Sequence, residues 1–208
     1  RALVFSSLLS VTSAQQLKAQ LQANILIILL SVFLIILGLS AIALFMLRWK
    51  TKELFLISFG VFCMLYGVRL LATRADNVLE LFLEVPQGFW DNLEYAITYI
   101  IPIPFIIFME QVYGKGWKSS IRRLWQIWLL FAATALLLLF FNYGVRYVMY
   151  FNNLLVILVV SVGLANVFLP GQQLTRELRA LRASFLIFAV MALLENLFDL
   201  IHLQFSMY

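Results

Sequence analysis

The sequence predicts an all-α fold, a polytopic membrane helical bundle of six transmembrane helices. Hydrophobic residues make up 64% of the 208 residues and charged residues only 12%, so a soluble domain of this length is not supported. The apolar residues fall into six long blocks, and the short connections between the blocks alternate between basic and acid-leaning. The fold is therefore to be understood with the bilayer, rather than water, as its solvent.

Each block is long enough to cross a membrane, because about 20 apolar residues in a helix span a hydrocarbon core about 30 Å thick. The first, fourth and fifth blocks contain no charged residue, and the fifth is followed by the helix-stop sequence Leu169-Pro170-Gly171. The other three blocks carry charge toward one end. Open strands would leave backbone polar groups unsatisfied in lipid, which favours helices. The predicted helices cover residues 24–47, 54–73, 91–113, 124–145, 147–168 and 183–202.

The connecting loops predict the orientation of the bundle. Ten of the fifteen Lys and Arg residues follow the first, third and fifth helices, so by the positive-inside rule these loops are cytoplasmic and the N-terminus lies outside. The cytoplasmic loops are then residues 48–53, 114–123 and 170–182. Tryptophans are expected in the two interfacial belts, with Trp90 in the outer belt and four in the inner one: Trp49, Trp117, Trp125 and Trp128.

The two ends of the chain lie outside the membrane in this interpretation. Residues 1–23 are an extracytoplasmic lead-in, and they can be read either as the end of an upstream domain running into a polar linker at 15–22 or as a short signal-peptide core. The bundle occupies residues 24–203, and residues 204–208 form an end on the outer side. The net charge of +5 mostly reflects the basic loops and predicts contact with anionic lipid rather than with nucleic acid.

Ionisable residues inside the predicted spans are the candidates for function, because such residues are costly in a bilayer and usually face a bundle interior or a wet cavity. Arg69 lies fifteen residues past Leu54, or about 22 Å along the helix, and Glu195 lies twelve residues past Ala183, or about 18 Å. These two residues are therefore at similar depth. Glu195 also begins a stripe on one helix face, since Asp199 and His202 follow at helical spacing.

The hypothesis is an outward-facing polar pocket lined by the second, third and sixth predicted helices, with Arg69 and Glu195 as its deepest pair. An excess of carboxylates favours a cationic or hydrogen-bonding ligand, or a proton. The alternative is that the pair only fixes helix packing while the other charged residues reach the aqueous interface. The candidate residues are Arg69, Asp91, Glu94, Asn152, Glu195, Asn196, Asp199 and His202.

Two further features carry predictions. Pro102 and Pro104 interrupt the third predicted helix, because each lacks a backbone donor, and the resulting kink is a hinge hypothesis with simple helix packing as its alternative. Glu110 is expected to pair with a nearby basic loop residue. Small residues suited to close helix contact occur in the fourth and fifth predicted helices: Ala132, Ala133, Ala135, Ser161, Gly163 and Ala165.

Enzymatic chemistry is not expected of this chain. The sequence contains one histidine and one cysteine, Cys63, and it shows no phosphate-binding glycine loop, kinase motif or phosphatase metal site. A site formed by Asp199, His202 and a third carboxylate is a weak metal signature, so neither a metal nor a cofactor is predicted.

Two segments resemble the bacterial seven-transmembrane receptors with diverse intracellular signalling modules, including those joined to phosphatase-type output domains. The segments are LFLISFGVFCMLYGVRLLATR (54–74) and YAITYIIPIPFIIFMEQVYG (95–114). The similarity in the order and pattern of apolar and polar residues extends over about 24–202. The resemblance implies an integral protein of the bacterial inner membrane with an outside N-terminal domain, and a seventh helix leading to a cytoplasmic effector. This chain shows six helices and no effector, as expected for the membrane part alone.

We therefore expect the membrane sensor of a bacterial signal-transduction protein, which detects an extracytoplasmic ligand or a membrane state and acts as a possible homodimer. A small proton- or cation-coupled transporter or channel, using Arg69, Glu195 and Asp199, is the first alternative. A membrane scaffold or assembly subunit, whose buried charges only specify packing, is the second.

Overall fold

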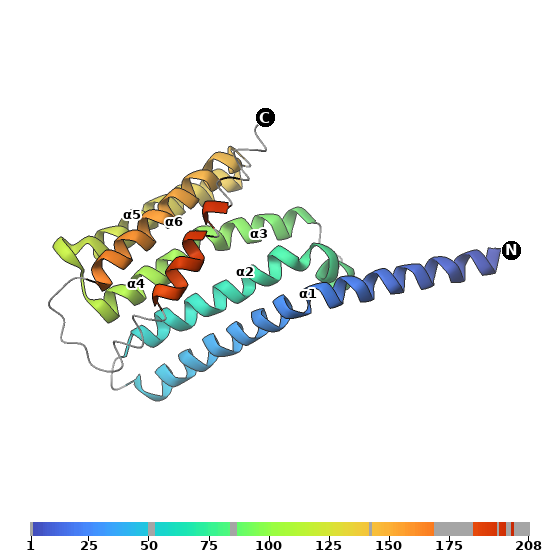
Figure 1. Cartoon of the computed structure of the whole chain (residues 1–208), viewed down its shortest axis with the longest axis horizontal. Coiled ribbons are helices and arrows are strands. Elements are labelled where there is room, and N and C mark those ends of the chain that lie inside the picture. Colours follow the sequence, from blue (N-terminus) through green and yellow to red (C-terminus); the bar gives the residue numbers. More distant parts are fainter. Residues whose placement is uncertain are drawn as a thin grey trace. The chain divides into compact units, whose positions relative to one another are not determined.

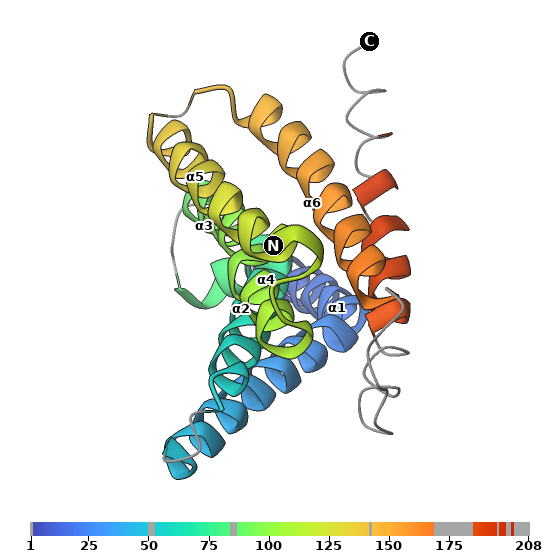
Figure 2. The same ribbon diagram turned by 90° about the vertical axis from the view of Figure 1, so that its left-hand side faces the viewer.

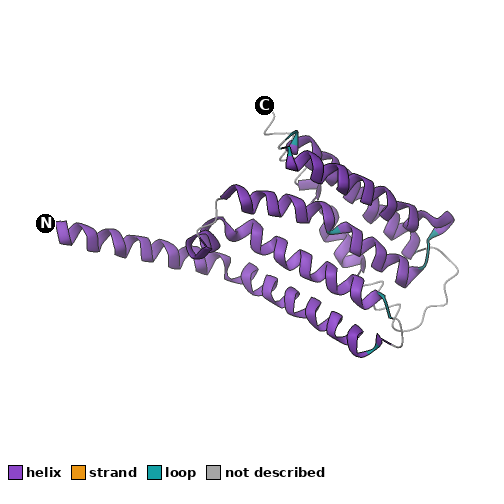
Figure 3. Cartoon of the chain, turned by 180° about the vertical axis from the view of Figure 1, so that it is seen from behind, coloured by secondary structure: helices purple, strands orange, loops and turns teal. Residues whose placement is uncertain are grey.

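In the part of the chain that it describes, the computed structural model consists of helices joined by short loops, with no strand there (Figure 3). It describes residues 2–49, 53–83, 87–141, 143–168, 185–194, 196–198 and 201, with the backbone alone at 2–24, 74–83 and 87. The all-α prediction is confirmed.

Within the part of the chain that the structure describes, five helical stretches are long and apolar enough to cross a membrane. They are Ile25–Leu47, Phe55–Thr73, Gly88–Tyr113, Trp117–Phe140 and Val145–Val167. A shorter apolar helix at 185–194 and 196–198 falls within the sixth predicted span. The chain is therefore an integral membrane protein built as a helical bundle.

Two compact units make up the chain, Arg1–Thr98 and Tyr99–Tyr208. In the first unit, α1 (Ala2–Leu47) and α2 (Phe55–Leu83) form an antiparallel pair, and α1 continues past the end of α2 (Figure 1). The helix α1 has 46 residues and is about 69 Å long. It begins well before the predicted start at residue 24 because Gln, Lys, Ala and Leu in the preceding polar segment are good helix formers. The predicted linker at 15–22 is thus helical.

The close contact between α1 and α2 depends on glycine. A Cβ atom built at Gly38 would lie 2.6 Å from the Gly60 carbonyl oxygen, and one built at Gly60 would lie 2.8 Å from the Gly38 oxygen. One heptad away, a Cβ at Gly67 would lie 2.8 Å from the Ser31 oxygen. We call these four residues the glycine seam, and it brings the two backbones closer than any larger side chain would permit.

The third predicted helix is interrupted near its middle. Its first part is α3 (Gln87–Ile100) and its second part is α4 (Pro102–Tyr113), with Ile101 between them. Ile101 keeps right-handed helical angles, φ −47° and ψ −43°, so the chain breaks its hydrogen-bond ladder without forming a loop. The reason is chemical, because residues 102 and 104 are prolines and cannot donate to the carbonyl groups four residues earlier. The helix is therefore interrupted where the sequence predicts a kink, and the hinge stays a prediction.

The second unit contains α4, a short 3-10 helix η2 (Trp117–Ser119), α5 (Ser120–Phe140) and α6 (Val145–Val167). The helix α5 begins four residues before the predicted start at 124 and ends five residues before the predicted end at 145. It begins earlier because its first turn includes charged residues, which a hydropathy pattern leaves out of a span. Figure 2 shows α6 beside the helix at 185–194, and a Cβ at Gly163 would lie 3.1 Å from the Phe185 ring.

Candidate functional site

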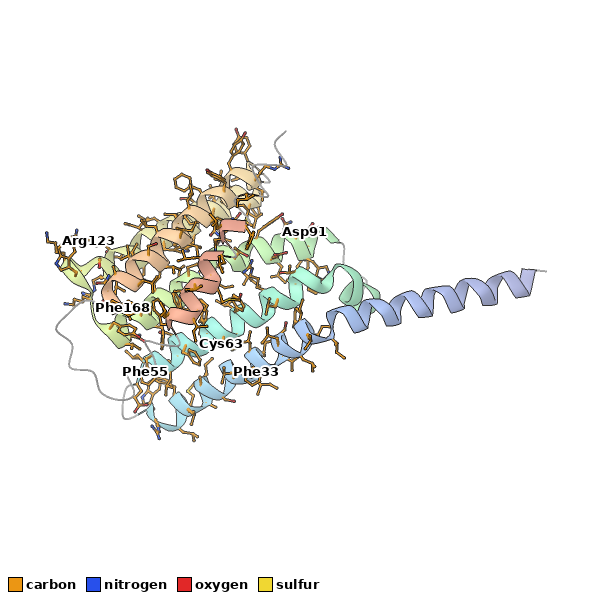
Figure 4. The ribbon with its side chains drawn as sticks, in the orientation of Figure 1. Phe33, Phe55, Cys63, Asp91, Arg123 and Phe168 are labelled. Atoms are coloured by element: carbon orange, nitrogen blue, oxygen red, sulfur yellow. The ribbon has the colours of Figure 1, made fainter. Side chains whose placement is uncertain are left out.

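The predicted pocket residues fall on both units. Arg69 is half-buried in α2. Asp91 is exposed near the start of α3 (Figure 4), and Glu94 is half-buried one turn later. All three belong to the first unit. A joint pocket formed by these three residues stays a prediction from the sequence.

The polar stripe of the sixth predicted helix lies outside the described residues, because Glu195, Asp199 and His202 are not among them. Their pairing and ligand roles therefore stay predictions from the sequence. The flanking Asn196 is described and half-buried, and its amide donates to the Ala192 carbonyl at 2.8 Å. That bond within its own helix is the usual way for a polar side chain to be satisfied in a membrane helix.

Asn152 is buried in the second unit together with its neighbour Asn153. Their exposed fractions are 2% and 3%, and the Asn152 amide donates to the Asn153 side-chain oxygen at 3.4 Å. Within the described part of the chain, the Asn152 side-chain oxygen and the Asn153 side-chain nitrogen have no other partner. Because buried amides are costly when unsatisfied, this pair marks a polar point inside an otherwise apolar span.

The helix break is held by a tryptophan from α5. Trp128 is 1% exposed, and its indole N–H donates to the carbonyl oxygen of Tyr99 at 2.8 Å, two residues before Ile101. Phe131 packs edge-on against both rings, with centroid distances of 5.6 Å to Trp128 and 6.1 Å to Tyr99. The prediction that Trp128 lies in the inner belt was wrong, because residue 128 lies about 12 Å into α5 and its indole finds a partner in the bundle core.

A carboxylate ties α4 to α5 near the other end of α4. Glu110 accepts a 2.7 Å hydrogen bond from the Arg122 guanidinium through one oxygen and a 2.8 Å bond from the Trp125 indole through the other. The predicted pairing of Glu110 with a basic loop residue is confirmed. Charge-assisted bonds of this length are stronger than neutral ones, so this contact fixes the α4–α5 corner.

Asn166 fastens the end of α6 to the same corner. Its side-chain oxygen accepts from the Trp117 backbone N–H at 2.7 Å, and its amide donates to the Ser120 hydroxyl at 3.0 Å and to the Val162 carbonyl at 2.8 Å. Gly116 must be glycine here, since φ is +74° and a Cβ would lie 2.7 Å from the Asn166 oxygen. Sequence reasoning missed Asn166, because an asparagine late in a helix gives no signal of a distant partner.

These contacts divide the second unit into a fixed end and an interrupted middle. Glu110 and Asn166 hold α4, α5 and α6 together at one end, while Trp128 bonds to the Tyr99 carbonyl just before the break at Ile101. No group of three potential metal-ligating residues occurs among the residues that the structure describes.

Comparison with known proteins adds no assignment. No family model matches the chain, and neither a curated protein nor a solved structure matches it.

Proposed function

We propose that this chain is the membrane-embedded sensing part of a bacterial signal-transduction protein. It would pass an outside or intramembrane signal to a cytoplasmic effector that lies outside the chain, with its N-terminus outside and two copies acting together. The proposal draws on the resemblance of 54–74 and 95–114 to seven-transmembrane receptors and on the contacts of the second unit.

The Trp128–Tyr99 hydrogen bond is the observation that carries the proposal. A sensor needs an element with two arrangements of similar energy, and a helix interrupted by prolines already lacks part of its own hydrogen-bond ladder. One side-chain bond among packed aromatic rings then holds Tyr99 against α5. The net contribution of such a hydrogen bond to stability is about 1 kcal/mol, which the binding free energy of a ligand could overcome.

The long helix α1 supports the same proposal. At about 69 Å it is more than twice the thickness of the hydrocarbon core, so one continuous helix joins the membrane span to the segment before it. A displacement of that segment would be transmitted into the glycine seam without an intervening flexible linker. A transporter has no evident need for such a connection.

The experiment is a paired measurement on purified protein in liposomes and in micelles. Proton flux is followed with an entrapped pH-sensitive dye, and thermal stability is measured against a panel of small amines, polyols and amides. A sensor is expected to give flux no higher than protein-free liposomes. At least one compound should raise its stability, by about 2.7 kcal/mol at a hundred times its Kd.

A matched pair of variants separates the alternatives. Glu195→Gln tests the predicted intramembrane carboxylate, and Glu53→Gln is its control because Glu53 lies in the loop before α2, outside the predicted pocket. Proton flux that is lost in Glu195→Gln but kept in Glu53→Gln, with folding intact, would establish a transporter and refute the sensor. A stoichiometric partner on co-purification, with no compound raising stability, would establish a scaffold instead.

A further inference from the structure

A group of cationic side chains and one exposed tryptophan gathers where α4 passes into α5. Trp117 is 63% exposed, and the Lys118 ammonium lies 4.6 Å from the centre of its ring. Lys115, Arg122 and Arg123 are also exposed, and Figure 4 shows Arg123 at the N-terminal end of α5. We call these five residues the Trp117 patch.

The positive charge of the patch is not cancelled locally. Glu110 is the nearest acid along the chain, and both of its oxygens are already engaged, one by Arg122 and the other by the Trp125 indole. Among the described residues, Lys115, Lys118 and Arg123 form no ion pair. Three cations therefore remain available to an anion from outside the chain.

The backbone of the patch is held in place before any ligand arrives. The Trp117 N–H donates to Asn166, the Ser119 N–H to the Gly116 carbonyl at 3.1 Å, and the Ile121 N–H to the Lys115 carbonyl at 3.2 Å. Lys118 keeps a left-handed φ of +49°, which a flexible loop would relax. A preorganised surface loses less conformational entropy on binding.

The patch lies at the boundary of the membrane. One span ends at Tyr113 and the next begins at Trp117, so the cations stand at the level where lipid headgroups lie. Tryptophan rings favour this level because they are apolar with a polar N–H, and lysine side chains near helix ends extend toward it.

We propose that the Trp117 patch is a binding site for the headgroups of anionic phospholipids. The Trp117 ring lies among the upper acyl chains and glycerol groups, while Lys115, Lys118 and Arg123 bind the phosphate oxygens. Zwitterionic lipid binds more weakly because its own amine repels the cations. The site does not depend on the proposed sensor function.

The test compares apparent Kd values for single lipid adducts by native mass spectrometry of the full chain in micelles. Dioleoyl phosphatidylglycerol and dioleoyl phosphatidylcholine are titrated separately. The test variant is Lys115→Gln/Lys118→Asn, in which asparagine tolerates the left-handed φ at 118. Neither lysine side chain takes part in the hydrogen bonds that hold the loop, and circular dichroism checks that helicity is kept.

Because one cation near an anionic surface contributes about 1 kcal/mol, which is about fivefold in affinity, the double variant should weaken phosphatidylglycerol binding about 25-fold. Its phosphatidylcholine binding should change little. The control Arg146→Gln, at an exposed arginine in the first turn of α6, should leave both values within twofold. Equal preference of the original protein for the two lipids would overturn the proposal. The proposal would also be overturned if the test and control variants lost the same phosphatidylglycerol affinity for each positive charge removed.

Discussion

The glycine seam makes the sharpest prediction about stability, tested by Gly60→Ala. The added Cβ would lie 2.8 Å from the Gly38 oxygen and 2.8 Å from Ile42 Cγ1, whereas ordinary contact begins at 3.4 Å. The helices must therefore separate locally by about 0.6 Å, and gaps of this size forfeit a quarter or more of the dispersion energy of the facing atoms. The Gly38 oxygen is backbone and cannot rotate away.

The expected cost follows from two opposing terms. Overpacking of this kind costs about 1–3 kcal/mol, while alanine gains up to about 1 kcal/mol over glycine in a helix. When the full gain of about 1 kcal/mol is subtracted, Gly60→Ala should lower the free energy of unfolding by up to about 2 kcal/mol. Gly88→Ala is the control, because Gly88 is helical and exposed and a Cβ there meets nothing within 4 Å. It should be neutral or slightly stabilising.

Unfolding is followed by titrating sodium dodecyl sulfate into mixed micelles and monitoring helicity by circular dichroism. The double variant Gly38→Ala/Gly60→Ala adds a second test. Once the helices have separated for the first methyl group, the second costs less, so the two losses should be sub-additive. Equal stability of Gly60→Ala and Gly88→Ala would refute the close contact, and strict additivity would show that the two glycines act independently.

Three other predictions concern the second unit. Trp128→Phe removes the donor to the Tyr99 carbonyl and should cost about 1–3 kcal/mol in the same titration, so an unchanged midpoint would contradict the hydrogen bond. Gly116→Ala should destabilise more than Gly144→Ala. Both glycines have positive φ, where a residue with a Cβ atom is strained by about 1–2 kcal/mol. Of the two, only Gly116 would place the added methyl group within 4 Å of another atom. In a variant lacking the native cysteine, Lys118→Cys should react in right-side-out vesicles only with a membrane-permeant thiol reagent. Labelling by an impermeant reagent would reverse the predicted orientation.

The sequence reveals the spans better than their ends. Hydropathy sums over about 20 residues and therefore finds the apolar core of each helix, which is why five spans coincide with helices of the structure. It cannot find ends that are set by other forces. The polar start of α1 and the charged first turn of α5 are helical because of propensity and packing, and neither is apolar.

Contacts between helices were harder to predict than the helices themselves. The Glu110 pairing could be predicted because a carboxylate at the end of an apolar span needs a cation, and the next loop is rich in them. The importance of Gly38 and Gly60 could not, because close approach depends on the register of two helices. Among the small residues predicted for packing, Ala132, Ala135 and Gly163 are buried, whereas Ala133, Ser161 and Ala165 are exposed.

The two units are stabilised by different physical means, and this difference bears on how a signal could pass. The glycine seam of the first unit depends on shape, so it resists separation of α1 and α2. The second unit depends on a few directed hydrogen bonds, at Glu110, Asn166 and Trp128, each of which is either made or broken. Of these, Glu110 is charge-assisted and Asn166 has several partners, whereas Trp128 makes a single neutral bond beside a proline break. Of the three contacts, the Trp128 bond is therefore expected to contribute the least hydrogen-bonding free energy, because charge-assisted bonds are stronger than a single neutral one.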